Sequence, residues 1–224
     1  MKLANALPIL TTLIAVGSGV SCGDIAAPTR SNAYEWRLIT PTGTGTADTL
    51  SFHWPSSRLP VKVWAQDTLN LATHAKNGID QWKAGFLYGE FDAVLVSDSN
   101  VADVMVSAGS AIKGGFSVTR LESMLAPQCG GSTSFDLPVG SRVIQPPVRI
   151  FINLRVVPTA PDLEQCLALT TTHELGHAIG IFAHSPVATD LMYADPAVPG
   201  PSDRDRTTAE LAYHTEPTLT MGTR

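Results

Sequence analysis

Histidine is scarce in this chain, yet three of its six histidines fall in residues 166–186, which read CLALTTTHELGHAIGIFAHSP. His173 and His177 are four positions apart, and His184 follows seven positions later. Two histidines with that first spacing project from the same face of a helix, about one turn apart. Their imidazole nitrogens can therefore reach one metal ion. The stretch is a candidate for a catalytic metal site.

Glu174 directly follows the first of these histidines. From that position a carboxylate can take the proton of a water molecule as the water attacks a carbonyl. This is the zinc-hydrolase interpretation of H-E-x-x-H, a pattern that arises by chance in on the order of one chain in a hundred, so its context must support it. A hydrolytic zinc site needs a third protein ligand and an open position. Gly180 can turn the backbone out of the helix, and His184 can then return to the same ion.

In these residues the chain resembles the metzincins, zinc peptidases with the pattern H-E-x-x-H-x-x-G-x-x-H and a methionine-containing turn downstream. HELGHAIG is similar to the matrixin branch, and HSPVATDLMY resembles the segment that leads into the methionine turn. The resemblance implies zinc as the cofactor. It implies as site residues the zinc ligands His173, His177 and His184, the water-activating Glu174, and Met192 beneath the metal.

The third histidine departs from the family pattern by one position. The family has two residues between the glycine and this histidine, whereas this chain has three, residues 181–183. An extra residue in a loop costs little free energy compared with one in a helix. The downstream residues also keep their usual relation to His184, so we expect His184 to be the third ligand. Asp190 and His214 are the alternatives.

Hydrophobic periodicity predicts the elements that must position these residues. Alternating or apolar runs predict strands, and spacing of three to four residues predicts helices. We expect a loop over 126–141, and Asp162 as the cap of the motif helix. The expected strands are 59–66, 92–98, 102–109, 114–121 and 147–155, and the expected helices are 67–86, 162–180 and about 202–213. This order indicates one α+β (α/β) domain.

The resemblance implies a metzincin-like domain, in which a small mixed, twisted sheet packs with an active-site helix and a C-terminal helix. Residues 114–121 correspond by position to the edge strand with which metzincins pair an extended peptide. Strand addition of this kind supplies backbone hydrogen bonds with little sequence selectivity. The alternative for this stretch is an ordinary edge strand.

The N-terminus has the layout of an export signal. A lysine is followed by an apolar run and then by small residues that end at Cys22. We expect an export signal over 1–22, a linker over 23–45 and the catalytic domain over 46–224. The sequence GVSC resembles the lipobox of bacterial lipoproteins, which implies lipidation of Cys22, with plain cleavage nearby as the alternative. Lipidation would leave Cys129 and Cys166 as a pair in a compartment that permits disulfides.

The net charge of the chain excludes one class of binding partner. The formal net charge of -5 argues against nucleic acid as a partner. We expect an exported zinc endopeptidase that acts on proteins or peptides and is secreted or lipid-anchored at the bacterial cell envelope. Two alternatives remain, a non-catalytic metal-binding lipoprotein and a zinc amidase acting on a non-peptide or cell-wall amide.

Overall fold

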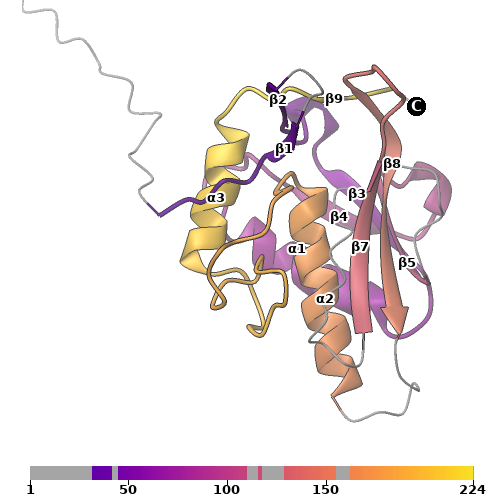
Figure 1. Ribbon diagram of the computed structural model, residues 1–224. Coiled ribbons are helices and arrows are strands. Elements are labelled where there is room, and N and C mark those ends of the chain that lie inside the picture. Colours follow the sequence, from indigo (N-terminus) through magenta and orange to yellow (C-terminus); the bar gives the residue numbers. More distant parts are fainter. Residues whose placement is uncertain (1–31, 42–44, 110–115, 118–128, 155–161, 224) are drawn as a thin grey trace, which may run out of the picture.

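A central, mostly parallel sheet packs with α-helices in a computed structural model that describes residues 32–41, 45–109, 116–117, 129–154 and 162–223 (Figure 1). Three α-helices occur in these residues. The expectation of one mixed α and β architecture is confirmed at this level.

The strands of the main sheet follow the order β4-β3-β5-β8-β7-β6. The bounds are β3 Val61–Ala65, β4 Ala93–Val96, β5 Val104–Ala108, β6 Phe116–Ser117, β7 Cys129–Asp136, β8 Val143–Leu154 and, paired with β8, β9 Thr220–Met221. The neighbours β4, β3, β5 and β8 are parallel, whereas β7 is antiparallel to both β8 and β6. Two 3₁₀ turns, Ser56–Arg58 and Ser99–Val101, precede β3 and β5.

Four predicted strands are confirmed, those at 59–66, 92–98, 102–109 and 147–155. In β8 the apolar side chains of Val148, Ile150 and Ile152 alternate and are all buried, as a half-buried strand requires. The strands β4 and β5 are consecutive in the chain but do not pair with each other. They lie on opposite sides of β3, and each pairs with it in parallel.

The loop expected over 126–141 is wrong for the residues that form β7. Glycine and serine, which strands usually avoid, dominate this stretch and suggested a loop. Pairing with the long β8 outweighs that preference, since it satisfies the backbone groups of β7 in an antiparallel ladder. Of the strand expected at 114–121, the structure describes only Phe116–Ser117, which form β6 at the edge of the described sheet.

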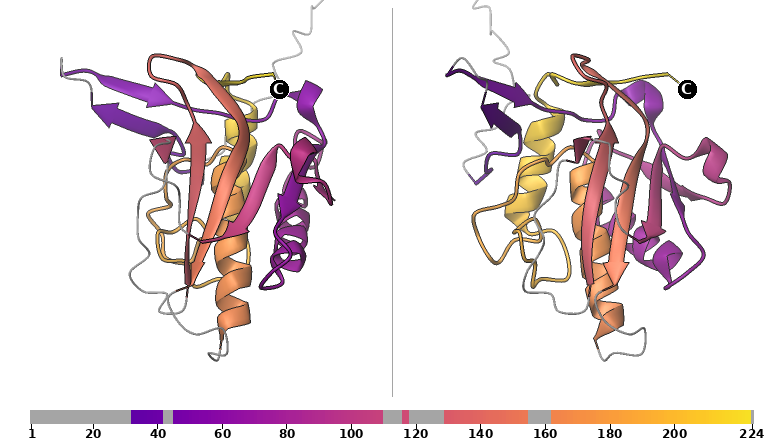
Figure 2. Two further views of the ribbon diagram at one scale, coloured as in Figure 1. Left: turned by 90° about the vertical axis from the view of Figure 1, so that its right-hand side faces the viewer. Right: turned by 45° about the vertical axis from the view of Figure 1, so that its right-hand side comes forward.

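The helices are α1 Leu71–Lys83, α2 Leu163–Ala178 and α3 Asp203–Tyr213, as predicted in type and place. The helices α1 and α2 lie side by side against the sheet, α1 next to β3 and β4 and α2 next to β7 and β8. In Figures 1 and 2, α3 lies on the side of α2 away from β7 and β8. Asp162 does not cap α2, because its backbone is left-handed (φ 65°) and its side chain makes no cap hydrogen bond. Ser202 caps α3 in a reciprocal arrangement with Asp205.

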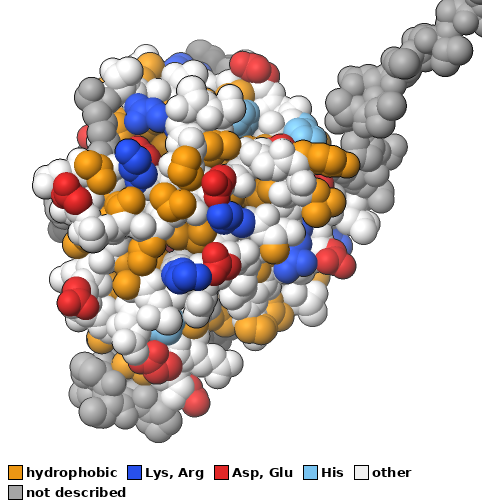
Figure 3. All heavy atoms as spheres, turned by 180° about the vertical axis from the view of Figure 1, so that it is seen from behind, with side chains coloured by type: hydrophobic (Ala, Val, Ile, Leu, Met, Phe, Trp, Pro, Cys, Tyr) orange, Lys and Arg blue, Asp and Glu red, His pale blue; other side chains and the backbone are white. Residues whose placement is uncertain are grey.

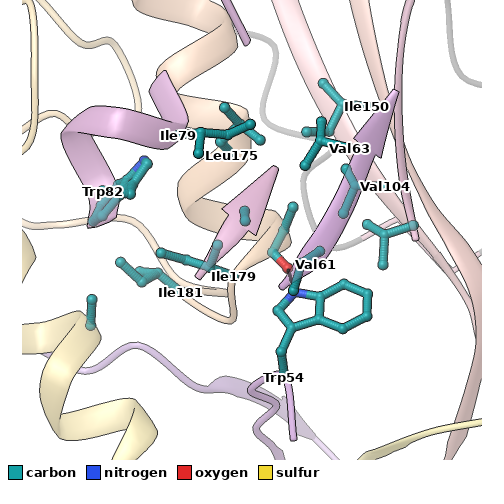
Figure 4. Packing of buried hydrophobic residues seen from close by; sticks show 14 of the residues in the cluster. Trp54, Val61, Val63, Ile79, Trp82, Val104, Ile150, Leu175, Ile179 and Ile181 are labelled. Atoms are coloured by element: carbon teal, nitrogen blue, oxygen red, sulfur yellow. Dashed lines mark hydrogen bonds between the residues drawn. The ribbon is translucent and has the colours of Figure 1, made fainter. Parts of the chain in front are cut away.

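Two buried tryptophans form hydrogen bonds that connect α2 to the core. Trp54 lies among aliphatic side chains of β3, β5 and α2 (Figure 4). Its Nε1 donates to the carbonyl of Ala178 at 3.0 Å, and Nε1 of Trp82 donates to the carbonyl of Thr172 at 2.8 Å. Both acceptors belong to α2, so the core sets the position of the helix that carries the histidines.

The packed domain begins upstream of residue 46, where the linker was expected to end. Tyr34 and Trp36 are buried in the core, and β1 (Leu38–Pro41) pairs with β2 (Ala47–Leu50) in an antiparallel ribbon that projects from the body (Figure 2). Burying two large aromatic rings outweighs the flexible composition around them. The expected export signal, with Cys22, lies outside the described residues.

The outer face seen from behind carries lysine, arginine, aspartate and glutamate side chains interspersed among apolar ones (Figure 3). Within the described part of the chain, no helix is both long and apolar enough to cross a membrane.

Cys129 and Cys166 form a disulfide, with their Cα atoms 6.1 Å apart. The bond links the first residue of β7 to the N-terminal half of α2. It therefore joins the antiparallel strand covalently to the helix that carries the histidine motif.

Replacing both cysteines by serine should lower the free energy of unfolding by about 2–4 kcal/mol, because the bond closes a segment of 37 residues in the unfolded chain. Urea titration followed by tryptophan fluorescence measures the loss. The wild-type protein in reductant is the control and should show a similar loss. Equal stability of oxidised and double-serine proteins would contradict a structural role for the bond.

Candidate metal centre

The structure brings together the three histidines of the motif. His173 and His177 are buried on α2, and His184 is half-buried on the loop that follows. The Nε2 atom of His177 lies 3.1 Å from that of His173 and 3.3 Å from that of His184. One nitrogen from each of the three rings lies within 4.8 Å of the others, so the set can hold a metal ion.

The hydrogen bonds of the rings assign their tautomers. Nδ1 of His173 lies 2.7 Å from the carbonyl oxygen of Leu191, and Nδ1 of His177 lies 2.6 Å from that of Ile181. A carbonyl oxygen only accepts, so Nδ1 is the protonated nitrogen in both rings. In a neutral imidazole the other nitrogen, Nε2, then carries a lone pair.

Burial keeps these imidazoles neutral. It lowers the pKa of His173 and of His184 to about 4, and it holds the pKa of His177 well below the ordinary 6.5. The facing Nε2 atoms of His173 and His177 are therefore two lone pairs that repel each other, not a hydrogen-bonded pair.

A cation between the rings would turn this repulsion into coordination. Tetrahedral ligands at 2.0–2.1 Å from a zinc ion stand about 3.3 Å apart, which is close to both measured separations. The donor set therefore fits a metal ion of this size, with imidazole nitrogens that are already deprotonated and oriented.

Residues 181–183, which lie between Gly180 and His184, are held in place by Trp36 from the start of the described chain. The carbonyl oxygen of Trp36 accepts from the backbone N–H groups of both Phe182 and Ala183, at 2.7 and 2.9 Å. Gly180 has φ +121°, and an added Cβ would collide with the carbonyl oxygen of Phe52. A glycine at the turn and an acceptor from a distant segment thus accommodate the extra residue.

Asp205, near the start of α3, holds the chain around Met192. Its carboxylate accepts from the backbone N–H of Leu191 at 2.7 Å and from the hydroxyl of Tyr34 at 2.8 Å. The carbonyl of Leu191 is in turn the acceptor for Nδ1 of His173. A fully buried carboxylate is therefore connected to a histidine of the cluster through a single residue.

Met192 is fully buried against the middle of α2. A Cβ added at Gly176 would collide with the methionine sulfur and would lie 2.6 Å from the ring of Trp82. Met192 therefore packs on the helix turn between His173 and His177, where the resemblance places the methionine turn.

The two alternative ligands have other partners. Asp190 is buried and accepts from the hydroxyls of Ser185 and Ser202, the latter at 2.7 Å, and it pairs with Arg204 at 3.3 Å. His214 lies 3.2 Å from the carboxylate of Glu90. Neither residue belongs to the histidine cluster found among the described residues.

Glu174 is buried on α2, where its Oε2 accepts a hydrogen bond from the hydroxyl of Thr133 at 2.7 Å. Burial raises the pKa of Glu174 to about 8, and the hydrogen bond from Thr133 opposes the rise. Thr133 lies in the stretch expected to be a loop. The signal for a strand there was the alternation of Thr133 with Phe135, a β-branched and an aromatic residue two positions apart.

Comparison with known proteins leaves the family unassigned. No model of a known protein family matches the chain. No curated protein matches it either. The metal centre is therefore interpreted from its own geometry.

We expect the metal-free protein to bind one Zn²⁺ per chain, and replacement of His184 by alanine to weaken that binding strongly, since three imidazoles share the ion. Isothermal titration calorimetry measures stoichiometry and affinity. His214→Ala is the matched control and should bind like the wild type. Equal affinities for His184→Ala and the wild type would rule out His184 as the third ligand.

Burial should also set the pH range of metal binding. Because the pKa values of His173 and His184 lie near 4, protons compete with the metal only as the pH falls toward 4. Between pH 7 and pH 5.5 an ordinary histidine with a pKa of 6.5 would cost about eightfold in affinity per ligand. We expect a total change below about threefold, measured by calorimetry with corrections for buffer protonation. A loss of affinity of about eightfold per histidine would contradict the lowered pKa values.

Proposed function

We propose that this protein is a zinc-dependent endopeptidase with a metzincin-like architecture. The observation that carries the proposal is the pair of buried, neutral imidazoles whose Nε2 lone pairs face each other at 3.1 Å, with His184 beside them. Glu174 adjoins this cluster on the same helix, as a hydrolytic zinc site requires.

Zinc is the metal that suits this donor set best. Neutral imidazoles are preferred ligands of zinc, and three protein ligands leave a fourth position open for water or substrate, which is the arrangement of catalytic rather than structural zinc sites. The backbone carbonyls of Leu191 and Ile181 hold two of the rings in the required tautomer.

Glu174 is the proposed general base and acid. When bound, zinc would polarise the scissile carbonyl and acidify the attacking water. Glu174 takes a proton from that water and later delivers it to the leaving amine. Burial raises the pKa of Glu174 to about 8 in the metal-free protein, and the positive charge of a bound zinc ion would lower it toward neutral pH, where a group both accepts and returns a proton readily.

The proposed substrates are proteins or peptides, and the proposed location is the bacterial cell envelope or its exterior. The location rests on the export-type N-terminus and on the disulfide between Cys129 and Cys166, a bond typical of oxidising compartments. A lipid tether at Cys22 belongs to the same proposal.

Replacing Glu174 by glutamine should lower kcat for peptide cleavage by about 10²- to 10⁴-fold and leave one zinc per chain, because the glutamate handles protons and does not bind the metal. Casein or gelatin cleavage and metal analysis of the same samples provide the two measurements. His214→Ala should retain full activity. A wild type that binds zinc and cleaves no peptide would instead favour the metal-binding lipoprotein or the non-peptide amidase.

A further inference from the structure

The strand β7 forms a wall against the side chain of Glu174. Gly131 and Thr133 are two positions apart on this strand, so they share the face that packs on α2. A Cβ added at Gly131 would lie 2.6 Å from both Cγ and Oε1 of Glu174. The glycine therefore leaves a slot that the glutamate side chain occupies.

The hydroxyl of Thr133 contacts Glu174 twice. Its Oγ1 lies 2.7 Å from the carboxylate oxygen Oε2 and 3.0 Å from the backbone carbonyl of the same residue. Thr133 is fully buried, and only 4% of the glutamate is exposed. The hydroxyl is thus a desolvated donor fixed between the side chain and the backbone of one residue, where a hydrogen bond to a carboxylate is stronger than in water.

This contact restricts a side chain that otherwise has three rotatable bonds. The slot above Gly131 limits where the carboxylate can lie, and the hydroxyl of Thr133 selects one orientation by binding Oε2. The covalent link between Cys129 and α2 adjoins the same segment of strand and keeps the two elements in register. A general base held in one orientation loses less entropy when it reaches its reactive geometry.

We propose that Thr133 is the positioning residue for Glu174: its hydroxyl holds the carboxylate in the orientation that takes the proton from the attacking water. The inference rests on the proposed peptidase function. Thr133 acts through Glu174, so its loss should lower kcat and leave the Michaelis constant and the zinc content unchanged.

The test compares three variants of one residue in the full, zinc-loaded protein. Thr133→Val keeps the branched shape and removes the hydroxyl, Thr133→Ala removes the hydroxyl with less bulk, and Thr133→Ser keeps the hydroxyl. Thr171→Val is the matched control, because it removes a buried hydroxyl of α2 that has no hydrogen-bond partner in the described structure. Peptide cleavage, zinc content and thermal unfolding are measured on each protein.

We expect kcat to fall about 10- to 100-fold in Thr133→Val and Thr133→Ala, the effect of losing a hydrogen bond to a charged group, with KM and zinc retained. Thr133→Ser should stay within about threefold of the wild type, as should Thr171→Val. If Thr133→Val does not fold, the comparison of Thr133→Ala with Thr133→Ser decides the question.

Two results would overturn the inference. One is an active wild type with unchanged or raised kcat in the variants that lack the hydroxyl. The other is an equal loss in Thr133→Ser, which would show that packing matters and the hydroxyl does not. A zinc-loaded wild type that cleaves no peptide would instead overturn the proposed function, and the inference with it.

Discussion

Two hydrogen bonds from imidazole Nδ1 atoms to backbone carbonyls orient the rings of the candidate metal centre. They turn the Nε2 atoms of His173 and His177 toward each other with their lone pairs exposed. Without a cation that arrangement is electrostatically unfavourable, and with one it becomes a pair of ligands. The two acceptors are held by hydrogen bonds from their own N–H groups, which Leu191 donates to Asp205 and Ile181 donates to the carbonyl of Gly176.

Distant parts of the chain contribute to that support. Asp205 holds the peptide of Leu191 from the start of α3, and Tyr34 donates to the same carboxylate. Trp36 fixes the backbone that leads to His184. Because these contacts are buried, each lost hydrogen bond would leave a polar group without water as a substitute. The segment before β1 is thus structurally part of the candidate metal centre.

Glu174 illustrates how burial and hydrogen bonding divide the control of one carboxylate. Desolvation raises its pKa, while the donor on β7 stabilises the charged form and directs one oxygen. The strand that provides this donor has a glycine, Gly131, where α2 approaches it closely. Gly131, on the face toward α2, leaves room for the side chain of Glu174, at the expense of intrinsic strand preference.

Sequence alone determined the three helices, four strands of the sheet and the membership of the histidine set, because each of these depends on spacing within one short segment. It also suggested the pairing of Cys129 with Cys166, because lipidation of Cys22 would leave these two of the three cysteines. It did not reveal β7, whose composition resembles a loop, nor the roles of Trp36, Thr133 and Asp205. Those roles arise from contacts between residues 14 to 171 positions apart. Only the tertiary structure brings such residues together, since local periodicity carries no information about which distant backbone group completes a buried hydrogen bond.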